Sequence, residues 1–178
     1  MLEHMRSMPV AVLLALSAAA SSHALPPSHY ALRVPGRTVT VTLSEDRFTG
    51  PETQLTRERD TLRGSAFGRA VSLKSQPGRV TGLVGAGPVQ LHVAKIVDGI
   101  EAVGPFAGQL SRLKVGPRAV SGRVGLCSYE LTSRGAGYEG WRTCGTQQPQ
   151  RTTLSLPPRA HEESVEARLA FLAVLLAQ

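Results

Sequence analysis

The chain has 178 residues, of which 42% are hydrophobic and 19% charged, and its formal net charge is +7. This length is enough for one domain with a buried core. The arginines are scattered singly and tryptophan occurs once, so no basic stripe interleaved with aromatic side chains indicates a nucleic-acid partner. An anionic polymer of the cell envelope stays open as a partner, because a positive chain attracts polyanions. The abundance of residues with GC-rich codons suggests a bacterial origin.

The N-terminal segment has the pattern of a secretory signal peptide. Arg6 precedes an apolar run at residues 9–20, and a small-x-small sequence follows at Ser22, His23 and Ala24. The apolar run is too short to span a bilayer, which takes about 20 residues. We therefore predict a signal peptide over residues 1–24, cleavage between Ala24 and Leu25, and export to the periplasm or the cell exterior.

Residues 25–158 are predicted to form one antiparallel β domain. Short runs alternate between apolar and polar residues, as at residues 38–43, and glycine and proline separate the runs. Asp98 and Gly99 are predicted to form a two-residue type I′ turn. The pattern indicates roughly ten to twelve short strands, in a meander closed into a small barrel or folded into a sandwich. A parallel β-solenoid is the structural alternative, but its coils would repeat more evenly.

Three stretches align at equal length without gaps, at residues 62–73, 80–91 and 120–131. Each has a large apolar residue in its first position, glycine in its third and leucine in its last. We interpret this frame as a recurring β-hairpin unit, in which the internal glycine marks a bulge or a bend.

Residues 159–178 are predicted to form one helix packed on the β domain. Val165, Leu169, Leu172 and Leu176 make an apolar stripe, and acidic residues occupy the first turns. The stripe favours a helix that covers a sheet edge or plugs a barrel mouth. Membrane association is the alternative, but the apolar tail is only about ten residues long, and no membrane span is expected in the mature chain.

The two cysteines of the chain, Cys127 and Cys144, fall in register across a predicted hairpin. A two-residue loop at Gly135 and Ala136, with residues paired outward from it, brings the cysteines opposite each other. This pattern predicts a cross-strand disulfide that stabilises the scaffold. A metal site would need three or four ligands, and a redox pair usually has the spacing CxxC; neither is present, so no metal or cofactor is expected.

The same register places Trp141 on the opposite face of the hairpin. An outward tryptophan is a candidate binding residue, although such a side chain more often packs under a loop or, here, under the terminal helix.

No catalytic motif is complete. Residues 82–87 lead into a strand and not a helix, residues 161–165 lack the second histidine of a zinc protease, and Ser65 stands one place too early for a nucleophile elbow. We therefore expect an exported, non-enzymatic protein with a binding or structural role in the cell envelope or outside the cell. Two alternatives stay open: a small barrel whose apolar lumen carries an apolar small molecule, gated by the terminal helix, and a secreted hydrolase with residues from distant positions.

Overall fold

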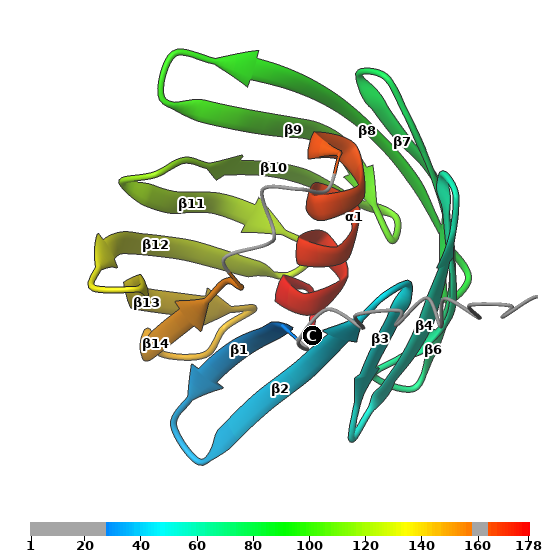
Figure 1. Cartoon of the computed structure of the whole chain (residues 1–178). Coiled ribbons are helices and arrows are strands. Elements are labelled where there is room, and N and C mark those ends of the chain that lie inside the picture. Colours follow the sequence, from blue (N-terminus) through cyan, green and yellow to red (C-terminus); the bar gives the residue numbers. More distant parts are fainter. Residues whose placement is uncertain (1–27, 158–163) are drawn as a thin grey trace, which may run out of the picture.

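The structure is a computed structural model that describes residues 28–157 and 164–178. The predicted signal peptide, its cleavage site between Ala24 and Leu25, and the start of the predicted C-terminal segment lie outside the described residues. Within them the chain forms a closed antiparallel barrel of 14 strands around one helix (Figure 1). The elements are β1 (Ser28–Val34), β2 (Arg37–Ser44), β3 (Arg47–Gly50), β4 (Thr53–Glu58), β5 (Thr61–Ala66), β6 (Arg69–Gln76), β7 (Arg79–Val84), β8 (Gly87–Ile96), β9 (Gly99–Phe106), β10 (Gln109–Val115), β11 (Ala119–Val124), β12 (Cys127–Arg134), β13 (Gly137–Cys144), β14 (Gln150–Ser155) and α1 (Val165–Leu176).

The predicted meander is confirmed, and of the two predicted closures the barrel is the one observed. Each strand pairs with its neighbours in sequence, and β1 pairs with β14 to close the sheet. The structure has more strands than the roughly ten to twelve expected. The difference comes from very short strands such as β3, which has four residues and shows almost no alternation by itself.

The inner face of the wall is apolar because alternate residues of each strand point inward. On β2, Val39, Val41 and Leu43 are buried, as the alternation predicts, while Thr38 and Thr40 are exposed. Most of the other strands repeat this pattern, so the barrel presents a largely polar outer face and surrounds a hydrophobic core.

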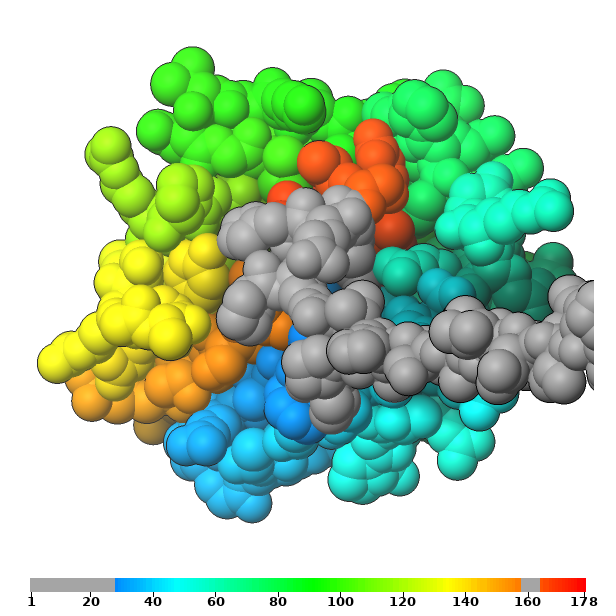
Figure 2. Space-filling view, viewed as in Figure 1, coloured from blue at the N-terminus to red at the C-terminus, as the bar shows by residue number. Residues whose placement is uncertain are grey.

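Helix α1 lies inside the barrel and completes this core (Figures 1 and 2). Ser164 caps its first turn by accepting a hydrogen bond from the Ala167 amide at 3.1 Å. Residues 169–176 are all buried, so the helix is covered on every side rather than along the single stripe predicted from sequence. The ring of Phe171 lies 4.3 Å from that of Phe48 and 4.6 Å from that of Tyr30. These rings anchor the helix to the wall.

The three aligned stretches all form hairpins with a two-residue turn at the same place, joining β5 to β6, β7 to β8 and β11 to β12. The internal glycine marks a bend and not a bulge. Gly82 pairs with Leu73 in an uninterrupted register, has φ +139°, and would place a Cβ atom 2.0 Å from the Ser72 carbonyl oxygen. Glycine therefore allows β7 to bend closely over β6, as a tightly curved wall requires.

The predicted turn at Asp98 and Gly99 is wrong by one position. Ile96 pairs with Gly99, so the two turn residues are Val97 and Asp98. Gly99 instead lies within the strand, where a Cβ atom would come 2.3 Å from the Val115 carbonyl oxygen. Close approach between strands, which the local sequence does not show, fixes the place of this glycine.

The two ends of the barrel differ. We call "mouth end" the end with the turns at residues 97–98, 116–118 and 135–136, and "disulfide end" the end with the turns at 85–86 and 125–126 and the loop at 145–149. Helix α1 runs from the mouth end to the disulfide end. Glu166 in its first turn accepts a hydrogen bond from the Gly78 amide at 3.0 Å, and after its last turn the Ala177 carbonyl accepts one from Arg69 at 3.1 Å.

Candidate functional site

The hairpin of β12 and β13 has the register predicted from its turn. Gly135 and Ala136 form the loop, Ser133 pairs with Tyr138, and Cys127 pairs with Cys144. The two cysteines lie at disulfide distance, with an S–S separation of 2.03 Å and a Cα–Cα separation of 4.0 Å. The predicted pairing is therefore confirmed.

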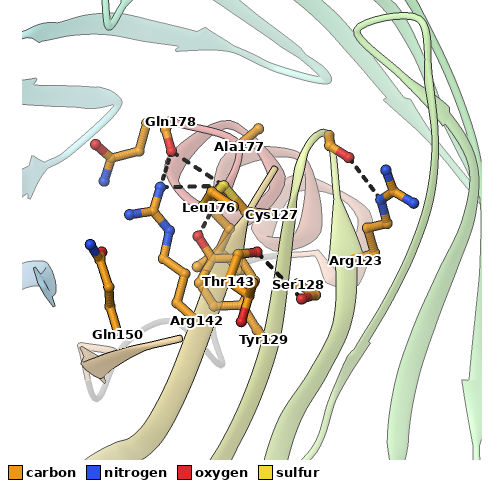
Figure 3. Close-up of a disulfide and its surroundings, with 12 residues drawn as sticks. Arg123, Cys127, Ser128, Tyr129, Arg142, Thr143, Gln150, Leu176, Ala177 and Gln178 are labelled. Carbon is orange, nitrogen blue, oxygen red and sulfur yellow. Dashed lines mark hydrogen bonds between the residues drawn. A yellow bond between two sulfur atoms is a disulfide. The ribbon is translucent and has the colours of Figure 1, made fainter. Parts of the chain in front are cut away.

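Side chains of the wall hold the end of α1 against the disulfide (Figure 3). Tyr129 donates a hydrogen bond to the Leu176 carbonyl at 2.5 Å, and Arg142 donates one to the backbone oxygen of Gln178. Arg142 also lies 3.3 Å from the Cys127 sulfur. The last carbonyls of a helix have no partner within the helix, so these contacts satisfy groups that burial would otherwise leave unpaired.

Burial raises the pKa of Tyr129 from 10.0 to about 12, although the neighbouring Arg142 favours the ionised form. The phenol therefore stays protonated and continues to donate its hydrogen bond at any ordinary pH. Sequence analysis did not single out Arg142. Its position two residues before Cys144 puts it on the inward face of the hairpin, and that signal was available.

A cavity of about 830 Å³ opens at the mouth end. Its walls come from the turns between β8 and β9, β10 and β11, and β12 and β13, and the first half of α1 contributes Arg168. The lining is mainly apolar: Ile96, Ile100, Val115, Pro117, Leu156 and Pro157. These residues are spread over the sequence, and the curved wall and the helix bring them together.

Few polar groups line this cavity. The hydroxyl of Tyr138 donates a hydrogen bond to the Gly116 carbonyl at 2.9 Å, and burial raises the pKa of this phenol, while the charge of Arg168 opposes the rise. Lys95 and Arg168 are the cations of the lining, and among the described residues that form it none is a carboxylate or a histidine. The lining residues thus suit the binding of an apolar molecule, and they offer no pair of groups for acid–base or nucleophilic chemistry.

Trp141 lies on the outer face of β13, as the register predicts, between Glu130 of β12 and Arg151 of β14. Its side chain is 48% exposed. The interpretation that the terminal helix covers it is wrong, because α1 lies inside the barrel. The Arg151 guanidinium carbon lies 5.8 Å from the centre of the indole ring.

Residues 28–157 and 164–178 contain no group of three or more histidine, cysteine, aspartate or glutamate side chains that could hold a metal ion. In the same part of the chain, α1 falls short of the length at which an apolar helix can cross a membrane.

The motif considered for a hydrolase gives no site. Ser65 stands on the exposed face of β5, between Gln54 of β4 and Ala70 of β6, and neither of these neighbours is an acid or a base.

Comparisons of the chain with models of known protein families, with curated proteins and with solved structures found no match.

Proposed function

We propose that this is an exported, non-enzymatic binding protein that receives an apolar small molecule at the mouth end of its barrel. The observation that carries the proposal is the cavity of about 830 Å³ among Ile96, Val115 and Leu156. Small-molecule sites are typically concave, about 300–1,000 Å³ in volume, and mainly apolar with a few polar groups. The mouth cavity has all three properties.

The ligand of this proposal occupies the mouth and not the lumen. The lumen is apolar, but α1 fills it, and residues 169–176 are buried against the wall. A ligand in the lumen would have to displace Phe171 from its contacts with Phe48 and Tyr30. A ligand in the mouth needs no such change, because it lies beside the first half of the helix.

Export is supported by two independent features. Residues 6–24 have the pattern of a signal peptide, and Cys127 and Cys144 lie at disulfide distance. Disulfides persist in oxidising compartments such as the periplasm and the cell exterior, and they are rare in the bacterial cytosol. A protein that meets its ligand outside the cytoplasm would have both features.

The binding proposal can be tested with N-phenylnaphthylamine, an uncharged apolar probe whose fluorescence rises when it leaves water. The purified full chain should bind it saturably. Ile96→Asp, which puts a carboxylate into the cavity lining, should weaken binding about tenfold or more. Val97→Asp is the matched control: Val97 is the next residue, is fully exposed at the tip of the same turn and does not line the cavity, so binding should persist.

Two results would overturn the proposal. One is the absence of saturable binding to the unmodified protein. The other is equal weakening by both substitutions, which would indicate a general surface effect and not a site in the mouth. Native mass spectrometry of protein from the exported fraction gives a separate test, because a co-purifying apolar molecule is expected.

A further inference from the structure

The outer wall carries a second place where a ligand can bind, centred on Trp141. Glu130, Trp141 and Arg151 form a row across three neighbouring strands, since each is the register partner of the next. About half of the indole side chain is exposed in the middle of this row. It therefore combines an aromatic surface with an acid on one side and a base on the other.

Two hollows flank the tryptophan. One of about 450 Å³ and one of about 620 Å³ share Trp141 and Glu130 in their linings. The first also includes Arg151 and Glu139, whereas Ser128, Thr143 and Pro149 complete the second. The tryptophan thus stands between two depressions of one outer surface. We call this surface, defined by the two linings, the "tryptophan groove".

The charged side chains of the groove differ in whether they form ion pairs. Glu139 forms ion pairs with Arg134 at 3.4 Å and with Arg151 at 4.0 Å. Arg151 also lies over the indole ring, which helps to fix the orientation of the ring. Glu130 forms no ion pair with any side chain in the described part of the chain, so its carboxylate can accept hydrogen bonds from a ligand.

We propose that the tryptophan groove binds a neutral oligosaccharide. A sugar ring has a face of C–H groups, which stacks on the electron-rich face of an indole, and hydroxyls around its edge, which donate to a carboxylate such as Glu130. The hydroxyls of Ser128 and Thr143 extend this polar edge. Residues 139–143 span about 13 Å along the strand, which gives room for more than one sugar ring.

Charge selects this ligand over a polyanion. Two carboxylates line the groove, and the two arginines beside them are already paired with Glu139. These two carboxylates and two arginines balance, so the groove offers no excess positive charge to a sulfated or phosphorylated polymer. The proposal does not depend on the mouth cavity, because the groove lies on the outer face of the wall.

The intrinsic fluorescence of Trp141 can report binding at the groove, because the chain has only one tryptophan. Titration of the full protein with chitopentaose, cellopentaose, maltopentaose and mannopentaose, followed by tryptophan fluorescence, should give a saturable change with at least one of them. Calorimetry with that sugar should show binding weakened about 10- to 100-fold by Trp141→Ala and clearly weakened by Glu130→Gln. Leu110→Ala removes another exposed apolar side chain of the wall, away from the groove, and should leave the affinity unchanged.

Three results would overturn this proposal. They are no fluorescence change with any of the four sugars at millimolar concentration, undiminished calorimetric binding by Trp141→Ala, and a saturable response to dextran sulfate in place of the neutral sugars. The last would assign the groove to a polyanion bound by Arg134 and Arg151. None of these results bears on the binding of N-phenylnaphthylamine at the mouth.

Discussion

The two ends of the barrel make different hydrogen bonds to the helix inside it. At the disulfide end, side chains of the wall bond to three consecutive backbone oxygens at the end of the chain: Tyr129 to residue 176, Arg69 to residue 177 and Arg142 to residue 178. At the mouth end, in the described part of the chain, Ser164 caps the first turn of the helix and Glu166 accepts a hydrogen bond from the Gly78 amide of the wall. Beside this first part of the helix lies the cavity of about 830 Å³.

The comparison indicates a division of roles along one axis. Tight packing and an open cavity cannot occupy the same place. The barrel has them at opposite ends of its helix, about 18 Å apart. We infer that the disulfide end supplies stability and the mouth end supplies binding. Changes at the first should lower the free energy of unfolding, and changes at the second should mainly alter affinity.

The largest loss of stability is expected where the helix meets the wall between the two ends. Phe171→Ala removes a ring that is 1% exposed and packs on Phe48 and Tyr30, so the free energy of unfolding should fall by about 3–5 kcal/mol. Trp141→Ala, also an aromatic truncation, should cost far less, because its side chain is half exposed. Urea denaturation followed by circular dichroism measures both. Equal losses would mean that the helix does not fill the barrel.

The next largest effect is expected from the disulfide. Replacing Cys127 and Cys144 together by alanine frees a loop closed over a sequence separation of 17, so stability should fall by about 2–4 kcal/mol. Affinity for N-phenylnaphthylamine should persist at a temperature where the variant is folded, because the bridge lies at the other end from the cavity. Thiol titration of the native protein should find no free thiol. A variant that is as stable as the parent but has lost binding would reverse the assigned roles.

Alkaline pH should weaken the disulfide end selectively. The pKa of Tyr129 is raised from 10.0 to about 12 in the folded protein, so its stabilising effect is complete below pH 10. Between about pH 10 and 12 the unfolded chain releases this proton and the folded chain keeps it, so about 2–3 kcal/mol of stability should be lost. Tyr129→Phe should be less stable at neutral pH and should lack most of this alkaline decline. An identical pH profile for the variant and the parent would refute the assignment.

The smallest effect is expected from the corresponding tyrosine at the mouth. Tyr138→Phe removes the hydrogen bond to the Gly116 carbonyl, in a half-buried setting that water can reach. Stability should fall by no more than about 1 kcal/mol, which is less than for Tyr129→Phe. Urea denaturation of these two variants measures how much more the tyrosine hydrogen bond contributes to the free energy of unfolding at the disulfide end than at the mouth end. A larger loss at Tyr138 would show that the mouth is also a stabilising region.

Local patterns in the sequence predicted the wall well. The turn at Gly135 and the pairing of Cys127 with Cys144 follow from counting outward, because a two-residue loop fixes the register of every later pair. The same reasoning failed at Gly99, because the backbone of the next strand, β10, approaches this glycine closely and fixes its place within β9. Local composition shows a turn residue, but it does not show which strand lies against it.

The interior and the sites were harder to predict. The apolar stripe of residues 165–176 favoured a helix that covers a sheet edge or plugs a barrel mouth, because the stripe does not reveal that the wall surrounds the helix along its length. The mouth cavity draws on residues from Lys95 to Arg168, which come together when the neighbouring strands β8 to β14 curve around α1. Trp141 was found from the register, but its neighbour Arg151 lies beyond the next loop, and the groove around Trp141 depends on the pairing of β13 with β14.

The division of roles between the ends is tested most directly by nuclear magnetic resonance of the isotope-labelled protein during titration with N-phenylnaphthylamine. Backbone amide shifts are expected to change at the mouth end, at residues 96, 99–100, 115–116, 133 and 135–138, which contribute to the cavity. The amides of residues 125–129 and 142–145, at the disulfide end, should stay in place. Shifts centred on the disulfide end, or spread evenly along α1, would contradict the account.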